Sequence, residues 1–482
     1  MNPHCGSITA YNSSNDPGLE IDARYKPDIV FYGSTKNISE GRVTSFQQME
    51  LFVEFKREAT SDPFADTKEQ FHKLFNTTCA TRGQMTLYST RMQMYQFRTC
   101  IFSVGIFGKV ARLFRWDRAG AIVSASIKLS AEGNRELAEF FYRFDLMDSA
   151  QRGWDPTVCD ATPEDTSAFA QAIRTAVGGG NDELLKSLLK SVGEPGEYPR
   201  KKINVIDGAG GQASYIVGRS SVTAKSPTGR ATRGFVAMDA QTRKLVFLKD
   251  SWRLDMKEVE PEDHWYKRLK GGEYIAAFLH GSDVGCVEDG GKVKKGGKVK
   301  KRRNVKKEGN VEEGGNVDEG GRVEKAGGKV RPQCTITQRH SKDWGSLQTM
   351  IGYIHYRTVQ SEFYIPLKMF KDSKNLTQIM HDIIMGKPSF QPSGVPPLIP
   401  PSAIHYVYGK GILHRDISAA NIMIAVDGRG RLIDFDLARE VTYSGARRTV
   451  RTVSYRVRGV CVVPRLISDR CRVHGNLCRP DY

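Results

Sequence analysis

The fold of this chain is decided by the stretch GILHRDISAANIMI, residues 411–424, and by LIDFD, residues 432–436. Each stretch contains a short apolar run of the kind that forms buried strands. The first also carries a carboxylate, Asp416, and a carboxamide five residues later, Asn421. The second places another carboxylate, Asp434, 18 residues after Asp416. The sequence therefore predicts two segments that converge on one polar site.

Phosphoryl transfer is a reaction that needs these residue types in this order. One carboxylate orients the attacking hydroxyl, while a carboxamide and a second carboxylate hold the magnesium that neutralises the phosphate oxygens. Asp416 suits the first task, and Asn421 and Asp434 suit the second. Each motif alone could arise by chance, but the ordered pair at this spacing is specific.

A lysine upstream fits the same chemistry. Residues 245–249 read LVFLK, an apolar strand that ends in Lys249. A lysine at that place can pair with nucleotide phosphates, and Glu262, 13 residues later in an expected helix, can hold it in position. Glu258 and Glu260 compete with Glu262 for that role. A solvated acidic helix is the alternative interpretation of all three glutamates.

The composition sets the wider frame. With 482 residues the chain is long enough for two to four domains, at roughly 100–200 residues each. Its net charge of +18 is uneven, since residues 289–331 and 439–482 each contribute +7. This distribution does not describe a generally basic, DNA-coating protein. No apolar run approaches the roughly 18 residues of a membrane helix, and the start lacks the features of a signal peptide.

Glycine, proline and charge runs divide the chain. We expect a flexible lead over residues 1–20, an α+β unit over 21–177 and a linker over 178–202. A second unit follows over 203–440, and a basic tail over 441–482. In the first unit we expect a strand over 49–56, a helix over 83–97, strands over 99–107, 109–116 and 121–128, and a helix over 135–144. The second unit carries a Pro-rich insertion over 386–402, with six prolines.

A second insertion, over 288–331, repeats a valine every six residues from 293 to 323. One valine per repeat among Gly, Lys and Glu cannot bury enough apolar surface to offset chain entropy, so we expect disorder. Three interpretations stay open for its basic half: a solvated loop, a nuclear import signal around 300–303, and a contact with nucleic acid.

At these residues the chain resembles the fungal-type protein kinase family, a divergent branch of the protein-kinase-like fold. The resemblance rests on residues 248–253, 355–359, 411–421 and 432–438, and on 96–98 and 115–120 upstream. It implies an α+β fold in which an accessory domain precedes a bilobal kinase domain that uses ATP and Mg²⁺. It also implies that Asp416 is the catalytic base, flanked by Arg415 and Ser418, that Asn421 and Asp434 bind magnesium, and that Lys249, with Glu262, binds phosphates.

Several features depart from the usual kinase pattern. No GxGxxG loop precedes Lys249, Ser418 stands where a lysine is usual, and Asp436 replaces the last glycine of Asp-Phe-Gly. Only 46 residues follow Asp436, fewer than a complete C-lobe needs. We therefore expect a truncated C-lobe and weak or absent phosphate transfer.

The first unit carries a second, more degenerate motif. Asp28 precedes Glu54 by 26 positions, Lys56 lies on the same face of the strand as Glu54, and Gln84 and Tyr88 lie four apart on a helix. This pattern resembles the PD-(D/E)xK nuclease-like domain. It would place Asp28 and Glu54 on a metal and Lys56 near an activated water. A charged strand face, or a nuclease-like fold without activity, are the alternatives.

The sequence leaves several readings of the whole open. A Ser/Thr protein kinase with a protein substrate is the first, and a nucleotide-binding pseudokinase or scaffold, a small-molecule kinase and a metal-dependent nuclease are the others. Nine scattered cysteines fit a reduced, intracellular protein, cytoplasmic or nuclear, without a membrane partner. Cys471, His474 and Cys478 could alternatively be zinc ligands.

Overall fold

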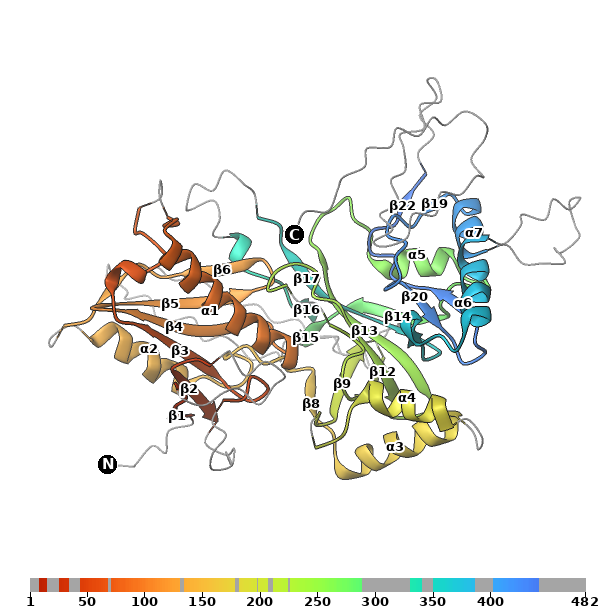
Figure 1. Cartoon of the computed structure of the whole chain (residues 1–482), viewed down its shortest axis with the longest axis horizontal. Coiled ribbons are helices and arrows are strands. Elements are labelled where there is room, and N and C mark those ends of the chain that lie inside the picture. The colour runs from red at the N-terminus through yellow and green to blue at the C-terminus, as the bar shows by residue number, and fades with distance from the viewer. Residues whose placement is uncertain are drawn as a thin grey trace, which may run out of the picture.

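Two mixed α+β units make up the computed structural model of this chain (Figure 1). The structure describes residues 8–14, 26–33, 44–67, 71–130, 134–177, 182–196, 198–206, 211–223, 226–287, 330–339, 350–385 and 402–441. The expected α+β class is confirmed. The predictions for residues 288–329, for 386–401, and for the tail from 442 with its suggested zinc ligands lie outside the described residues. The prediction of disorder over 288–331 is wrong for residues 330 and 331, which lie in a short paired strand.

The first unit is built on a seven-stranded sheet in the order β1-β2-β3-β4-β5-β6, with β7 beside β5. The strands are β1 (Ile8–Asn12), β2 (Ile29–Gly33), β3 (Leu51–Lys56), β4 (Ile101–Phe107), β5 (Val110–Asp117), β6 (Gly120–Val123) and β7 (Ile127–Lys128). Strands β3 and β4 are parallel because helix α1 (Asn76–Tyr95) connects them, while the other pairs are antiparallel. The prediction of a flexible lead over 1–20 is wrong for β1, which pairs with β2 along its whole length.

Both faces of this first sheet are covered. Phe52 packs with Met85, Tyr88 and Met92 of α1 on one face. Leu51 and Val53 pack on the other with Phe144 of helix α2 (Arg135–Leu146). The alternating sequence of β3 is therefore buried on both sides, from Leu51 to Glu54. The short 3₁₀ helix η1 (Ala59–Ser61) follows β3.

The second unit contains an eight-stranded sheet in the order β14-β17-β13-β12-β10-β9-β8, with β11 beside β12. The strands are β8 (Val158–Asp160), β9 (Lys201–Ile206), β10 (Gln212–Val217), β11 (Val222–Thr223), β12 (Arg233–Asp239), β13 (Leu245–Leu254), β14 (Phe278–Asp283) and β17 (Tyr353–Gln360). Strand β13 lies between β12 and β17, and its first eight residues are all buried.

Helices α3 (Pro163–Val177) and α4 (Asp182–Val192) cover one face of this second sheet (Figure 1). Phe169 and Ile173 of α3 and Leu188 of α4 pack with residues of β10, β12 and β13. The predicted boundary at 177 and the predicted linker over 178–202 are therefore wrong. The glycines around 178–180 suggested a hinge, but the apolar face of α4 buries against the second sheet.

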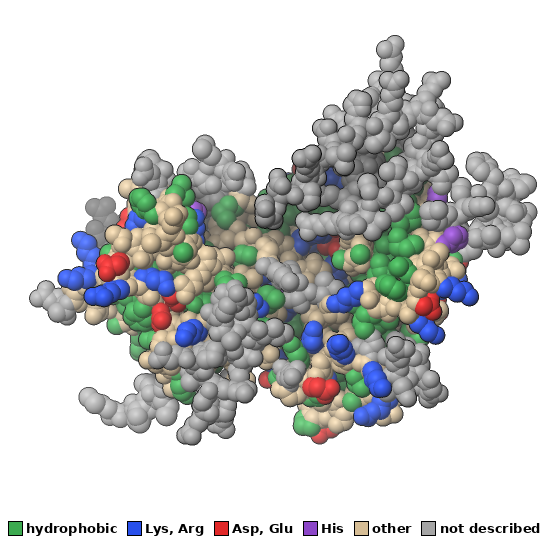
Figure 2. Space-filling view, in the orientation of Figure 1, with side chains coloured by type: hydrophobic (Ala, Val, Ile, Leu, Met, Phe, Trp, Pro, Cys, Tyr) green, Lys and Arg blue, Asp and Glu red, His purple; other side chains and the backbone are tan. Residues whose placement is uncertain are grey.

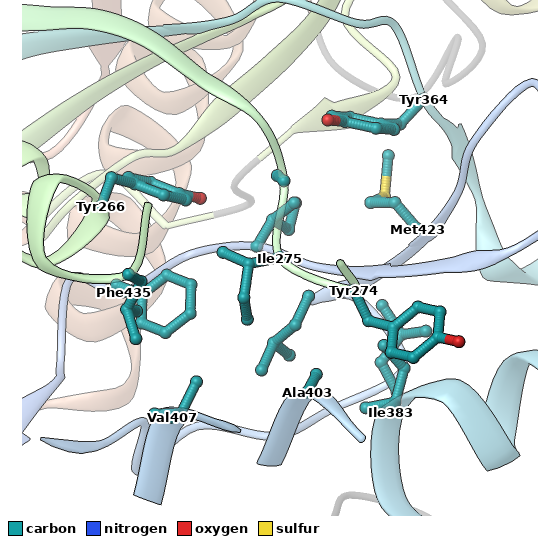
Figure 3. Close-up of a cluster of buried hydrophobic side chains, with 14 of the residues drawn as sticks. Tyr266, Tyr274, Ile275, Tyr364, Ile383, Ala403, Val407, Met423 and Phe435 are labelled. Carbon is teal, nitrogen blue, oxygen red and sulfur yellow. The ribbon is translucent and has the colours of Figure 1, made fainter. Parts of the chain in front are cut away.

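A smaller part with helices and short strands lies beside the second sheet, at the right in Figure 1. It contains α5 (Glu262–Arg268), β18 (Ile365–Pro366), η3 (Leu367–Met369), α6 (Ser373–Met380), the π-helical turn η4 (His381–Met385), α7 (Ala403–Gly409), β19 (Ile412–Leu413), β20 (Ile422–Ile424), β21 (Gly430–Leu432) and β22 (Arg439–Glu440). Strands β15 (Gly285–Val287) and β16 (Val330–Pro332) pair separately. One apolar cluster holds this part together, as Figure 3 shows with Tyr266, Ile383, Ala403, Val407 and Phe435.

The two units meet through the motifs at 96–98 and 115–120. The Asp117 carboxylate accepts hydrogen bonds from the amides of Ile336 and Thr337. The guanidinium of Arg233, at the start of β12, lies 4.1 Å from the ring centroid of Phe97 and donates to the Gln96 carbonyl. These contacts hold the first unit against the second, next to the strands β12 and β13 that carry the candidate site.

Candidate active site

Lys249 lies in the middle of β13, opposite Gly234 of β12 and Thr358 of β17. Its side chain is 4% exposed, so the ammonium group depends on ionic partners for its stability. Because side chains alternate along a strand, Lys249 and Asp250 point to opposite faces of the sheet. Lys249 faces α5 and the segment after β21.

Three carboxylates surround the Lys249 ammonium group. Its Nζ lies 2.7 Å from Glu262 Oε2, 2.9 Å from Asp434 Oδ1 and 3.0 Å from Asp436 Oδ2. Glu262 is the first residue of α5, and its other oxygen accepts a hydrogen bond from the Phe435 amide. We call Glu262, Asp434 and Asp436 the acid cluster. The structure thus brings Lys249, Glu262 and Asp434 together as the sequence predicts.

Charge decides the protonation of this cluster. The three acids raise the pKa of Lys249 above its usual value, against the opposing effect of burial. Burial raises the pKa of Glu262, and Lys249 with Arg230 lowers the pKa of Asp434 although burial opposes this. Asp434 therefore stays ionised beside the ammonium group. A carboxylate that stays ionised in a buried place suits a metal ligand.

The loop that carries Asp416 is tied to the Asp434 segment through His414. His414 Nε2 lies 3.0 Å from the carbonyl oxygen of Ile433, which can only accept, while its Nδ1 accepts from the Asp416 amide at 3.3 Å. Burial lowers the pKa of His414, and the two hydrogen bonds fit the neutral tautomer with its proton on Nε2. The ring also contacts Phe435 edge to face, at 4.6 Å between centroids.

Asn421 holds the other end of that loop. Its side-chain nitrogen donates to the Asp416 carbonyl at 2.8 Å, so its amide oxygen is the atom that it can offer to a metal. Its own carbonyl accepts from the Ile433 amide, because β20 and β21 pair directly after it. The Ser418 carbonyl accepts from the Asn421 amide. The structure therefore keeps Asp416, Ser418 and Asn421 in one short loop next to Asp434.

Two residues of the site have left-handed backbone. Arg415 has φ 70° and Asp434 has φ 67°, a region that costs a non-glycine residue roughly 1 kcal/mol. Strain of this kind concentrates at functional sites. The exposed Arg415 side chain lines a cavity of about 360 Å³ together with Asp436 and Trp265. Arg415 thus lies beside the acid cluster rather than against Lys249.

The donor set fits a magnesium ion. The acid cluster offers three carboxylate oxygens within 4.8 Å of one another, and Mg²⁺ prefers oxygen ligands, usually one or two carboxylates with water and phosphate. We had expected Asn421 and Asp434 as the metal ligands. In the structure Asp436 and Glu262 also lie close enough to Asp434 to be metal ligands. Lys249 forms ion pairs with all three acids, and Arg230 forms ion pairs with Asp434 and Asp436.

Helices lie beneath the Asp416 loop. Ala403 and Val407 of α7 and Ile383 of η4 pack against β19–β21 and Phe435 (Figure 3). Helices that precede Asp416 in the chain thus give its loop apolar support. The expectation of a truncated C-lobe concerns the residues after Asp436, and those from 442 lie outside the described residues. Ser402 caps α7 by accepting from the His405 amide.

The opposite face of β13 is an ionic network between the units. Asp250 accepts from Arg357 Nε at 3.0 Å and lies 3.0 Å from His355 Nε2. Arg357, which is fully buried, also donates to Asp155 at 2.5 Å. These groups explain the buried charges of residues 355–359. They position β13, and they do not reach the acid cluster.

A second polar cluster lies in the first unit, on β3 and α1. Lys56 Nζ lies 2.5 Å from Glu54 Oε1 and 2.9 Å from Gln84 Oε1, and Gln84 donates to Tyr88. Asp28 accepts from the Phe55 amide and helps to raise the pKa of Glu54. We call Asp28, Glu54, Lys56, Gln84 and Tyr88 the β3 cluster. The structure brings together all of the residues of the degenerate motif.

Glu54 is the unusual member of the β3 cluster. It is 2% exposed, and its second oxygen, Oε2, has no hydrogen-bond partner within the part of the chain that the structure describes. Burial is the main cause that raises the pKa of Glu54 to about 7, and Lys56 opposes it. An unpaired buried carboxylate oxygen calls for an explanation, such as an absent cation.

Sequence reasoning missed Arg230, whose Nη1 lies 3.1 Å from Asp436 and 3.7 Å from Asp434. It noticed Asp436 only as a replaced glycine. The signal that could have found Arg230 is its place in the segment before β12, where no GxGxxG phosphate-binding motif occurs.

On the face shown in Figure 2, the described Lys and Arg side chains are spread over both units among other side chains, without one concentrated basic surface.

Comparison with known proteins points in one direction. The family model described as fungal protein kinase matches residues 26–394, and the model described as protein kinase domain matches residues 400–460. The chain is 43% identical over 53 residues to a probable serine/threonine-protein kinase, mkcF, of Dictyostelium discoideum, and 35% identical over 46 residues to the serine/threonine-protein kinase STE20 of Eremothecium gossypii.

These two matches are short. They cover 11% and 10% of this chain, and 8% and 5% of the length of those relatives. Among solved structures, the ROP18 kinase domain in complex with AMP-PNP and sucrose aligns with a TM-score of 0.23 and 12% identity, over 59% of this chain and 69% of that one. An alignment with this TM-score does not bear on the fold. Among the described helices, none is both long and apolar enough to cross a membrane.

Proposed function

Because the chain belongs to the fungal protein kinase family, whose model matches most of its length, we propose that it is an ATP-dependent kinase acting on Ser or Thr hydroxyls of a protein. Membership of this family confirms the expected kinase-like α+β fold. ATP and Mg²⁺ as the cofactors, the hydroxyl specificity and the roles of single residues are parts of the proposal. So is a location inside the cell, in cytoplasm or nucleus, where ATP is available.

One observation carries the proposal. A buried lysine contacts Glu262 at 2.7 Å and Asp434 at 2.9 Å, beside a loop in which His414 ties Asp416 to the Asp434 segment. Lys249 would bind the nucleotide phosphates, and Asp434 with Asn421 would hold magnesium. Magnesium, when bound, neutralises charge on the phosphate oxygens.

The remaining residues act on the hydroxyl. Asp416 is placed to orient the substrate hydroxyl and to accept its proton. Asn421, through its bond to the Asp416 carbonyl, holds the loop in shape. Arg415 and Ser418 flank Asp416 and would position it and the substrate. Correct positioning supplies roughly 7–11 kcal/mol of a reaction barrier, so these contacts matter although they do no chemistry themselves.

The direct test is transfer of labelled phosphate from ATP to a generic basic protein. We expect the Asp416→Ala variant to lose roughly 10²–10⁴-fold of the rate while it still binds ATP with Mg²⁺. Equal labelling by both proteins would contradict the role of Asp416. Asp255→Ala, a change at an exposed residue after β13, serves as the matched control.

The same experiment separates the two kinase alternatives. A chain that binds ATP with Mg²⁺ but labels no protein would be a pseudokinase or scaffold. Labelling of a small hydroxylated metabolite in a substrate panel, without protein labelling, would identify a small-molecule kinase, an alternative that Ser418 suggests.

The β3 cluster supports a second candidate function, metal-dependent nuclease activity of the first unit. The observation behind it is the unpartnered, buried Glu54 Oε2 near Asp28, with Lys56 bonded to the same carboxylate. Asp28 and Glu54 would hold the cation, and Lys56 would lie close to an activated water. Nucleic acid would then be a substrate of this unit.

Cleavage of plasmid DNA in Mg²⁺ or Mn²⁺ tests this second function. We expect cutting by the wild type and by Asp416→Ala, and none by Glu54→Gln. If Glu54→Gln cuts as fast as the wild type, the cutting belongs to a contaminant. If no protein cuts, the proposed nuclease activity of the first unit is wrong.

A further inference from the structure

Arg230 lies in the connection between β10 and β12, which runs past the buried lysine. Strand β12 begins at Arg233, and its second residue, Gly234, lies opposite Lys249. The segment just before β12 therefore reaches the edge of the acid cluster. Arg230 Nη1 lies 3.1 Å from Asp436 Oδ2 and 3.7 Å from Asp434 Oδ1.

The backbone around Arg230 is held from two sides. Its carbonyl accepts from the Trp252 amide at 2.8 Å, and the amide of the preceding Gly229 donates to the Arg118 carbonyl at 2.9 Å. Gly229 has φ +94°, a conformation that favours glycine, and a Cβ there would meet no atom within 4 Å. Arg118 belongs to the first unit, so that unit helps to fix this segment.

The side chain of Arg230 is less constrained than its backbone. It is 28% exposed, whereas Lys249 is 4% exposed. Its present partners are two of the three acids that fit magnesium. When Asp434 and Asp436 serve as metal ligands, the Arg230 guanidinium needs another anion within its reach. A guanidinium binds phosphate oxygens with two parallel hydrogen bonds, a geometry that a lysine lacks.

We propose that Arg230 binds the terminal phosphates of the nucleotide and takes the role that a GxGxxG phosphate loop, a motif not found before Lys249, has in other kinases. This inference rests on the proposed function, because it needs the acid cluster to bind ATP with Mg²⁺. It assigns a side chain, rather than a glycine-rich backbone, to the outer side of the phosphates. Arg230 and Lys249 then contact the triphosphate from the segment before β12 and from β13.

The test compares binding of ATP, ADP and adenosine, each with Mg²⁺, by calorimetry. We expect Arg230→Gln to weaken ATP binding at least tenfold, ADP binding less and adenosine binding not at all. Arg230→Lys should recover part of the loss, since it keeps the charge and loses the paired hydrogen bonds. Arg219→Gln is the matched control, because Arg219 lies in the same connection but stacks on Tyr198.

Each outcome decides between the two levels of the proposal. If the wild type binds ATP and Arg230→Gln binds it equally well, Arg230 is only a structural partner of the acids. If Arg230→Gln binds ATP more tightly, Arg230 blocks the acids from binding the ligand. Either result overturns the inference. If the wild type binds no nucleotide, the proposed function fails, and the inference fails with it. An unchanged unfolding temperature of Arg230→Gln without nucleotide, together with the selective loss of ATP, would support the inference.

Discussion

The acid cluster around Lys249 and the β3 cluster around Lys56 use the same residue types in opposite ways. Lys249 is buried and contacts three carboxylates. Lys56 is 26% exposed, and the carboxylate that it contacts, Glu54, keeps one oxygen without a partner in the described structure. In the first cluster Lys249 and Arg230 lower the pKa of Asp434, although burial opposes this. In the second, burial of the acid dominates and raises the pKa of Glu54 to about 7.

This difference determines how each cluster would bind a ligand. The acids of the acid cluster are already in ion pairs with Lys249 and Arg230, so a ligand has to replace some of these ion pairs. The β3 cluster holds a carboxyl group that is half protonated near neutral pH, so a cation would bind in competition with a proton. Four substitutions, from the largest expected effect to the smallest, test this contrast.

Lys249→Met should have the largest effect on stability. It leaves three buried acids with one remaining cation, Arg230, and removing one partner of a buried ion pair costs about 3 kcal/mol or more. The measurement is urea denaturation at neutral pH. Lys244→Met, on an exposed residue just before β13, is the control and should cost little. A loss for Lys249→Met no greater than that of Lys244→Met would contradict the buried-cation account.

Glu54→Gln should change how stability depends on pH. The pKa of Glu54 rises from 4.5 to about 7 on folding, so the folded state keeps a proton that the unfolded state releases. Stability is therefore lost as pH rises from about 4.5 to about 7, by an amount on the order of 3 kcal/mol. Glu54→Gln should remove this slope. Glu58→Gln, a change at an exposed residue, should keep this slope. Equal slopes in the two variants would mean that folding does not raise the pKa of Glu54.

Lys56→Met should be milder than Lys249→Met. Because Lys56 lowers the pKa of Glu54, its removal raises that pKa further, and Glu54 takes up a proton instead of remaining as an isolated charge. We expect a loss of about 1 kcal/mol at pH 7, typical of a partly exposed pair. Denaturation at pH 6 and pH 8 should show a larger loss at the higher pH. A loss as large as that of Lys249→Met would erase the contrast between the clusters.

Tyr88→Phe should have the smallest effect of the four. The Tyr88 hydroxyl accepts from Gln84 and donates to the Lys26 carbonyl, while its ring packs edge to face on Phe52. The ring contacts remain in phenylalanine, so only the hydrogen bonds are lost, at about 1 kcal/mol or less. Thermal unfolding checks this. A drop larger than that of Lys56→Met would show that Tyr88 anchors the cluster.

The contacts of Lys249, Glu262 and Asp434 could be predicted from the sequence because each residue lies in or directly beside a segment with a clear pattern. An apolar run delivers Lys249, a helix begins at Glu262, and a β-hairpin sets Asp434 beside Asn421. The β3 cluster could be predicted for the same reason, since alternation on a strand puts Glu54 and Lys56 on one face.

Other features depend on tertiary register, which local pattern does not contain. Arg230 reaches the acids because Gly234 lies opposite Lys249, and no periodicity reveals that pairing. The glycines beside helix α4 predict a linker, whereas its apolar residues Leu188 and Val192 pack against the second sheet, a contact that local pattern does not contain. The packing beneath Asp416 depends on tertiary contacts as well, because Val407 of α7 and Ile383 of η4 reach Phe435 from distant parts of the chain.

Binding of ATP with Mg²⁺ by the wild type, by Lys249→Met and by Asp434→Asn is the measurement that tests the central claim most directly. The claim is that Lys249, Glu262 and Asp434 form a nucleotide site in this kinase-family chain. Calorimetry should show binding by the wild type and at least tenfold weaker binding by both variants, with Asp416→Ala unaffected. Equal binding by the wild type and both variants, or no binding by the wild type at millimolar ATP, would contradict the account.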